Sequence, residues 1–178
     1  ISKNKAHFES MSEARVTNVQ MNRQSLVNRL KSHLEPQKIP SPEVIPQAVK
    51  RGFNSNIWKE EALTCVECGA CNFICCTCHC FLLSDQQEGN IAERTRVWDA
   101  CLYQNFARVA GGANPMKRRF QRVRNRYLKK FNFFPENINL NACTGCGRCI
   151  ETCPAKIDIR RILRNLSIET QTYAGQSL

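Results

Sequence analysis

Eight of the twelve cysteines in this chain fall into two copies of one compact spacing. The first copy is Cys65-x2-Cys68-x2-Cys71-x3-Cys75. The second is Cys143-x2-Cys146-x2-Cys149-x3-Cys153, which Pro154 follows. Three thiolates separated by two residues, with a fourth further on after three, are the ligand pattern of a [4Fe–4S] cluster. The two copies therefore predict two [4Fe–4S] clusters and a chain that conducts electrons.

The fourth cysteine of each run is expected to serve the other cluster, as in two-cluster ferredoxins. One cluster then takes Cys153 with the first three cysteines of the first run, and the other takes Cys75 with the first three of the second run. This exchange would tie together two segments that lie far apart in the sequence. Glycines beside these cysteines can adopt positive φ and bring backbone N–H groups close to cluster sulfur. They are Gly69, Gly145 and Gly147.

Four further cysteines, Cys76, Cys78, Cys80 and Cys101, leave two interpretations open. They can be small buried side chains, because free cysteine is often buried. Alternatively, Cys78, Cys80 and Cys101 hold a third iron–sulfur centre, with Cys76 or Asp85 as the fourth ligand. A reversible dithiol is a further alternative for these residues.

Zinc is the main competing metal, since four-thiolate zinc sites are built from paired CxxC motifs. Such sites normally separate two pairs by a longer loop, whereas each run here offers a triplet and one nearby cysteine. The tight triplets also argue against a disulfide framework and favour a reducing, anaerobic cytoplasm. No Ser/His/Asp set, paired carboxylates or phosphate-binding loop stands out, so no catalytic residue is predicted.

The formal net charge of +11 is concentrated in segment 115–132, which has eight lysines and arginines and no acidic residue. Such a run is usually a solvated helix face with an apolar underside. Alternatively, it docks an acidic partner, or it raises the reduction potential of a nearby cluster. Nucleic-acid binding is less expected, because Phe120, Tyr127 and Phe131 follow core spacing rather than the charged face.

Apolar spacing and cap residues predict two helices before the first cysteine run. One covers 12–34, with Ser12 as its cap and Pro36 at its end. A proline-rich extended linker follows over 35–47. A second, short helix is predicted at about 55–63, with its tryptophan on the apolar side.

Three more helices are predicted after the first run, and no strand pattern is evident. The first covers 90–110 and ends at Gly111-Gly112. Its apolar stripe consists of Val97, Trp98, Cys101, Leu102, Phe106 and Val109. The second starts at Asn114-Pro115, crosses the basic run and ends before Pro135. The last lies near 158–166, and its buried face comprises Ile159, Ile162, Leu163 and Leu166, with Asp158 as its cap. The fold class is therefore mainly α.

No stretch is long and apolar enough to cross a bilayer, and the N-terminus has no apolar core of a secretory signal. The first residue is Ile1 rather than Met, so a processed or partial chain is expected. The composition thus favours a cytoplasmic protein without a membrane span.

Several motifs together resemble the iron–sulfur subunits of the anaerobic sulfite reductase A-chain and sulfhydrogenase β-chain group. The resemblance covers about residues 58–163. Besides the two cysteine runs, its motifs are Thr77-Cys78-His79-Cys80-Phe81, Trp98-Asp99-Ala100-Cys101, Ala110-Gly111-Gly112-Ala113-Asn114-Pro115, the arginines Arg122, Arg124 and Arg126, and Pro154. The chain departs from this group at Cys76, where proline is usual.

The resemblance implies a two-cluster α-helical ferredoxin-like domain at 58–168, after an N-terminal arm at 1–57 and before a tail at 169–178. The arm is expected to pack on a partner subunit. Members of the group pass electrons between a flavin- or nicotinamide-linked subunit and a catalytic subunit. For this chain, a ferredoxin-linked subunit stays open in place of the flavin- or nicotinamide-linked one. The resemblance also favours a third centre. Two other functions stay open: a thiol or disulfide reductase subunit acting at Cys75–Cys80, and a zinc-binding nucleic-acid module.

Overall fold

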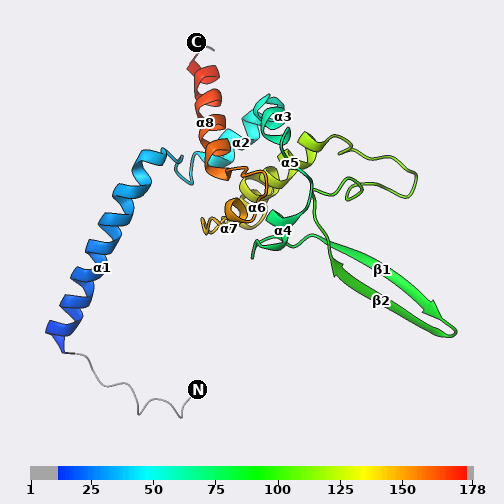
Figure 1. Ribbon diagram of the computed structural model, residues 1–178, viewed down its shortest axis with the longest axis horizontal. Helices are drawn as coiled ribbons and strands as arrows, with labels where there is room; N and C mark the ends of the chain where they lie inside the picture. Colours follow the sequence, from blue (N-terminus) through cyan, green and yellow to red (C-terminus); the bar gives the residue numbers. More distant parts are fainter. Residues whose placement is uncertain (1–11, 176–178) are drawn as a thin grey trace. The chain divides into compact units, whose positions relative to one another are not determined.

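The computed structural model describes residues 12–175, with side chains to Thr172, and the chain divides into two compact units (Figure 1). The first unit ends at Ile39 and contains α1 (Glu13–Leu34) and the 3₁₀-helix η2 (Glu35–Gln37). The predicted helix at 12–34 is thus confirmed. Ser12 occupies the N-cap, but its carbonyl rather than its side chain accepts the first helical hydrogen bonds. Apolar side chains of α1 are exposed, among them Val19, Leu26 and Leu30.

The second unit begins at Pro40, and short helices lead into the first cysteine run. They are α2 (Ile45–Arg51), the 3₁₀-helix η3 (Gly52–Asn54) and α3 (Ile57–Ala62). The predicted helix at 55–63 is confirmed. The extended linker predicted over 35–47 is wrong at both ends, because η2 and α2 are helical there. Pro46 lies in the first turn of α2, where a missing N–H costs no intrahelical bond.

An antiparallel hairpin stands where a helix over 90–110 was predicted. Its strands are β1 (Phe81–Glu88) and β2 (Ile91–Trp98), with Phe81 opposite Trp98 (Figure 1). The two residues Gly89-Asn90 make the turn, and Gly89 has φ of 57°. A two-residue Gly-Asn connection is a hairpin signal, which the helical stripe obscured. Trp98, expected in the core, is 69% exposed.

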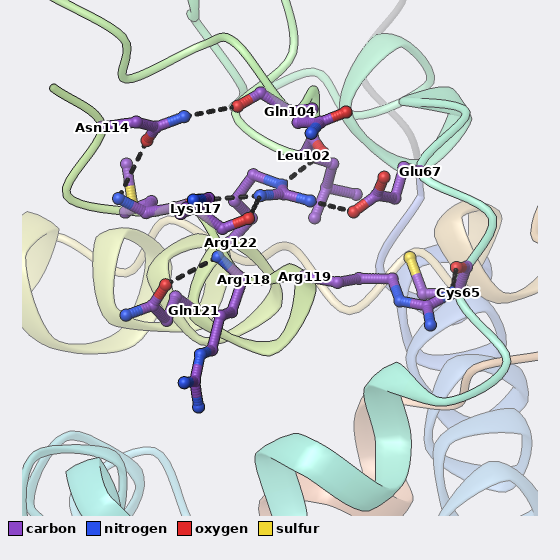
Figure 2. Close-up of polar contacts among 11 residues, drawn as sticks. Cys65, Glu67, Leu102, Gln104, Asn114, Lys117, Arg118, Arg119, Gln121 and Arg122 are labelled. Atoms are coloured by element: carbon purple, nitrogen blue, oxygen red, sulfur yellow. Dashed lines mark hydrogen bonds and ion pairs between the residues drawn. The ribbon is translucent and has the colours of Figure 1, made fainter. Parts of the chain in front are cut away.

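The basic run forms a nearly continuous helix of α5 (Arg119–Leu128), the π-helix η4 (Lys129–Phe133) and α6 (Phe134–Ile138). The predicted start at Asn114-Pro115 is wrong. Instead, Asn114 accepts from the backbone N–H of Met116 and donates to the carbonyl of Gln104, which orders the turn ahead of α5 (Figure 2). Pro135 does not follow the helix but lies in the first turn of α6, as Pro46 does in α2.

The two cysteine runs fold alike, and α8 closes the core. Each run contains one turn of helix, α4 (Ala70–Phe73) or α7 (Arg148–Glu151), and these two helices pack together. The last helix, α8 (Ile159–Gly175), is longer than predicted but starts as expected. The core lies among α2, α3, α5, η4 and α8 and includes Val49, Trp58, Val123, Tyr127, Phe131, Ile159, Ile162, Leu163 and Leu166.

The described residues are mainly helical, and the hairpin is the one sheet among them. The prediction of a mainly helical chain is therefore confirmed for the described residues, but the fold is not purely helical. Between residues 12 and 175, none of the helices has the length and apolarity that a membrane crossing needs.

Candidate iron–sulfur site

A pocket of the second unit brings thiols from both cysteine runs to one place. Cysteines of the first run and of the second share its wall, namely Cys65, Cys68, Cys71, Cys149 and Cys153. Four of the five are the ligands predicted for one cluster, including the distant Cys153. The remainder of the lining is largely apolar: Val66, Leu102, Val123, Tyr127, Pro154, Ala155, Ile157 and Ile159. The apolar wall limits solvent access to part of this pocket, although Cys68 itself is exposed, and limited solvent access is one way a protein sets a cluster potential.

Cys75, the predicted fourth ligand of the other cluster, is tied to the start of the second run. Its thiol lies 3.0 Å from Nζ of Lys130 and 3.3 Å from the hydroxyl of Thr77. That hydroxyl donates to the carbonyl of Ala142, which directly precedes Cys143. Lys130 also donates to the same carbonyl over 3.3 Å. These contacts bring the end of the first run to the beginning of the second.

The three glycines singled out in the sequence all have positive φ: 73° at Gly69, 69° at Gly145 and 74° at Gly147. Gly69 and Gly147 immediately precede α4 and α7. At Gly69 space is short as well, because an added Cβ would lie 2.9 Å from Cβ of Ala100. Glycine is thus required there both by the backbone conformation and by packing.

The additional cysteines gather around a buried asparagine. The Asn72 amide donates to the thiol of Cys101 over 3.2 Å and lies 3.9 Å from that of Cys78. Cys80 shares a hydrogen bond with Cys101. Cys76, by contrast, is exposed. Asp85, considered as a ligand, pairs with Arg94 on the hairpin at 2.7 Å.

The thiols differ in how readily they ionise. Burial raises the pKa of Cys71 to about 11. Burial also acts to raise the pKa of Cys75, but hydrogen bonds from Thr77 and Lys130 together outweigh it and lower the value to about 6. The hydrogen bond with Cys101 lowers the pKa of Cys80 to about 6 and raises that of Cys101. Thiolates are the form that binds iron, so the surroundings of Cys75 and Cys80 favour ligation.

Three cations of the basic run are buried instead of solvated. Arg122 is 3% exposed, Arg126 is 5% exposed and Lys130 is 4% exposed. They follow one another at intervals of four residues along α5 and η4, so they share one helix face. The expectation of a solvated helix face is therefore wrong for these three cations. Lys117, Arg118 and Arg119 are exposed, but they lie before α5 or at its first residue, and Arg119 donates to the carbonyl of Cys65 over 2.6 Å.

The residues fit an anionic, sulfur-rich cofactor. The pocket combines thiols with the buried guanidinium of Arg126, whose Nε has no hydrogen-bond partner in the described part of the chain. Between residues 12 and 175, no three Cys, His, Asp or Glu side chains converge as one metal ion requires. A [4Fe–4S] cluster spreads its thiolates over several iron atoms, so ligands placed around a cavity suit it better than zinc.

Sequence reasoning missed Asn72 and did not distinguish the buried cations from the exposed ones. A signal existed for the cations: Arg122, Arg126 and Lys130 recur every four residues, adjacent to the apolar positions of the same helix. Nothing in the sequence marked Asn72, whose role depends on Cys101, 29 residues away.

Comparisons with known proteins agree with this chemistry. A family model described as a 4Fe-4S dicluster domain matches residues 64–157. Subunit beta of sulfhydrogenase 2 from Pyrococcus furiosus is 40% identical over 112 residues, which are 62% of this chain and 33% of that protein. This chain thus spans about a third of the length of that relative. No solved structure matches.

Proposed function

We propose that this chain, which belongs to the 4Fe-4S dicluster domain family, relays electrons through two [4Fe–4S] clusters within an oxidoreductase complex. The observation that carries the proposal is the pocket in which Cys65, Cys68 and Cys71 share a wall with Cys153. A bound cluster of this kind accepts and releases one electron at a time. The task of the chain is to hold the clusters, to exclude water and to set their potentials.

The ligand sets follow the exchange between runs. Cys65, Cys68, Cys71 and Cys153 hold the first cluster, and Cys143, Cys146, Cys149 and Cys75 hold the second. The contacts of Thr77 and Lys130 with Ala142 support the second set, because they fasten Cys75 beside Cys143. Gly69, Gly145 and Gly147 allow the loops to approach the clusters closely.

A third centre at Cys78, Cys80 and Cys101 extends this proposal, with Cys76 as a further candidate ligand. The gathering of Cys78 and Cys101 on Asn72, together with the hydrogen bond between Cys80 and Cys101, supports it. Two clusters predict about eight iron atoms per chain, and a third centre of the same type predicts about twelve. Replacing Cys101 by Ser should remove only the additional iron.

The partners proposed are a flavin- or nicotinamide-linked subunit and a catalytic subunit. Similarity to a protein named as a sulfhydrogenase subunit supports a place in such a complex. The N-terminal arm with its exposed apolar side chains is proposed to pack on a partner. Twelve free thiols suit a reducing compartment such as the cytoplasm.

Anaerobic purification, followed by iron and acid-labile sulfide analysis and EPR spectroscopy, tests the proposal. We expect iron and sulfide in equal amounts and two distinct cluster signals after reduction. Cys153→Ser should abolish one signal and Cys75→Ser the other. A protein that binds only zinc and contains no sulfide would refute the assignment.

The thiol or disulfide reductase alternative is examined with the double variant Cys76→Ser, Cys78→Ser. If the two ferredoxin-type clusters persist while activity of the complex is lost, direct thiol chemistry gains support. Unchanged activity excludes Cys76 and Cys78 from that role.

A further inference from the structure

Arg126 is a buried cation without an acidic partner in the described part of the chain. It is 5% exposed, and none of the ion pairs among the described residues includes it. Its Nη2 donates to the carbonyl of Cys71 over 3.2 Å, while Nε has no partner. Burying a guanidinium with an unused donor is costly unless an anion compensates for it.

The location of Arg126 indicates which anions compensate for it. Its side chain lines the pocket that also contains Cys71, proposed for one cluster, and Cys149, proposed for the other. Arg126 therefore stands where the two proposed ligand sets meet.

Lys130 lies one helical turn further on, and its contacts involve only one of the two ligand sets. Its ammonium contacts the thiol of Cys75 at 3.0 Å, the hydroxyl of Thr77 at 2.8 Å and the carbonyl of Ala142 at 3.3 Å. It does not line the pocket that Arg126 shares with Cys65, Cys68 and Cys153. Lys130 is thus associated with one ligand set alone.

We propose that the charge of Arg126 stabilises the reduced state of both clusters, whereas that of Lys130 stabilises the reduced state of only the cluster ligated by Cys75. This inference rests on the proposed function. Reduction adds one negative charge to a cluster, and a nearby buried cation favours the more negative state. Arginine stays protonated at every working pH, so its contribution is permanent.

Redox titration of the full chain, followed by EPR spectroscopy, tests this assignment. The Cys153→Ser and Cys75→Ser variants first identify which signal belongs to which cluster. We expect Arg126→Gln to lower both midpoint potentials by at least about 59 mV. For a one-electron couple this corresponds to a tenfold change in the equilibrium constant of reduction. Lys130→Gln should lower only the potential of the cluster that Cys75 ligates.

Arg124→Gln is the matched control, because it removes one charge from the same helix. The Arg124 guanidinium stacks over Phe53 at 3.6 Å and donates to its carbonyl, so it is occupied outside the pocket. Both potentials should stay unchanged in this variant. An equal shift in Arg124→Gln would mean that overall charge, and not the place of Arg126, is responsible.

The outcomes separate this inference from the function on which it rests. Absence of iron and sulfide from the wild-type chain would refute the function. A loaded Arg126→Gln chain with either potential unchanged would overturn the shared role of Arg126. Should Arg126→Gln take up no iron, Arg126→Lys decides. If both midpoint potentials of Arg126→Lys equal those of the wild type, the charge of residue 126 is responsible. If Arg126→Lys also takes up no iron, the role of Arg126 is structural alone.

Discussion

The guanidinium of Arg122 forms an ion pair with the carboxylate of Glu67, between the basic helix and the first cysteine loop (Figure 2). The same guanidinium donates to the carbonyl of Leu102 over 3.1 Å and to those of Met116 and Lys117 over 2.7 Å each. One side chain therefore joins α5 to the turns before it and to the loop between Cys65 and Cys68.

Replacing Arg122 by Met should destabilise the chain strongly. The change leaves Glu67 without its partner and three carbonyls without this donor. Removing one member of a buried pair lowers the free energy of unfolding by about 3–5 kcal/mol, and the lower part of this range is expected here because Glu67 is 29% exposed. Urea unfolding under anaerobic conditions measures the loss. The control Lys117→Met alters an exposed side chain of the same run and should stay within about 0.5 kcal/mol of wild type; equal losses would contradict this role of Arg122.

Gly69→Ala and Gly89→Ala separate backbone strain from crowding. Both residues have positive φ, which costs an alanine about 1–2 kcal/mol. Only at Gly69 does the new Cβ meet neighbours, with Ala100 at 2.9 Å, and overpacking adds about 1–3 kcal/mol. We expect Gly69→Ala to lose more stability in urea and also to retain less iron. Equal behaviour of the two variants would show that the loop relaxes.

Asp158 should stabilise the start of α8 in a pH-dependent way. Its carboxylate accepts from the backbone N–H of Arg160 at 2.8 Å, and the hydrogen bond with the Arg160 side chain holds its pKa below the ordinary value of 3.8. Asp158→Ala should lower the free energy of unfolding by about 0.5–2 kcal/mol at neutral pH.

The sign of the pH dependence follows from the lowered pKa of Asp158. The folded chain keeps the carboxylate ionised at a lower pH than the unfolded chain does, so the contribution is complete above the unfolded value. It disappears as pH falls through the folded value. Denaturation curves of wild type and Asp158→Ala should therefore converge in acid, and Asp158→Asn should retain part of the cap. A constant difference down to strong acid would exclude this mechanism.

Leu166→Ala is expected to open a cavity in the packing of α8 against α2 and η3. Leu166 is fully buried, and a Cβ added to Gly52 would lie only 2.7 Å from its Cδ2. Loss of a buried leucine costs about 2–5 kcal/mol, which thermal unfolding detects as a lower midpoint temperature. Ile168→Ala, on the exposed side of the same helix, serves as the control and should change the midpoint little. Equal midpoint temperatures of unfolding in the two variants would show that Leu166 is not part of the core.

The hairpin shows why part of the fold escaped sequence reasoning. The residues from Val97 to Val109 satisfy a helical stripe, yet Trp98 ends β2 and is exposed, while Cys101 and Leu102 are buried in the turns that follow. A hydrophobic period records which residues are apolar but not where the chain reverses. The Gly89-Asn90 turn supplied that information, because a two-residue turn with positive φ joins antiparallel strands.

The sequence by itself determined the cluster-type cysteine runs, the glycines beside them and the helices at α1, α3 and α8. These features depend on neighbours a few residues away, since loop geometry, caps and apolar faces are local. Only the tertiary structure decided which cations face the thiols and which face solvent. Lys130 and Cys75 are 55 residues apart, and their contact exists because the core buries one side of α5 and η4 against the cysteine loops. Burial is a property of the packed chain, so charge alone could not distinguish Arg126 from Arg118.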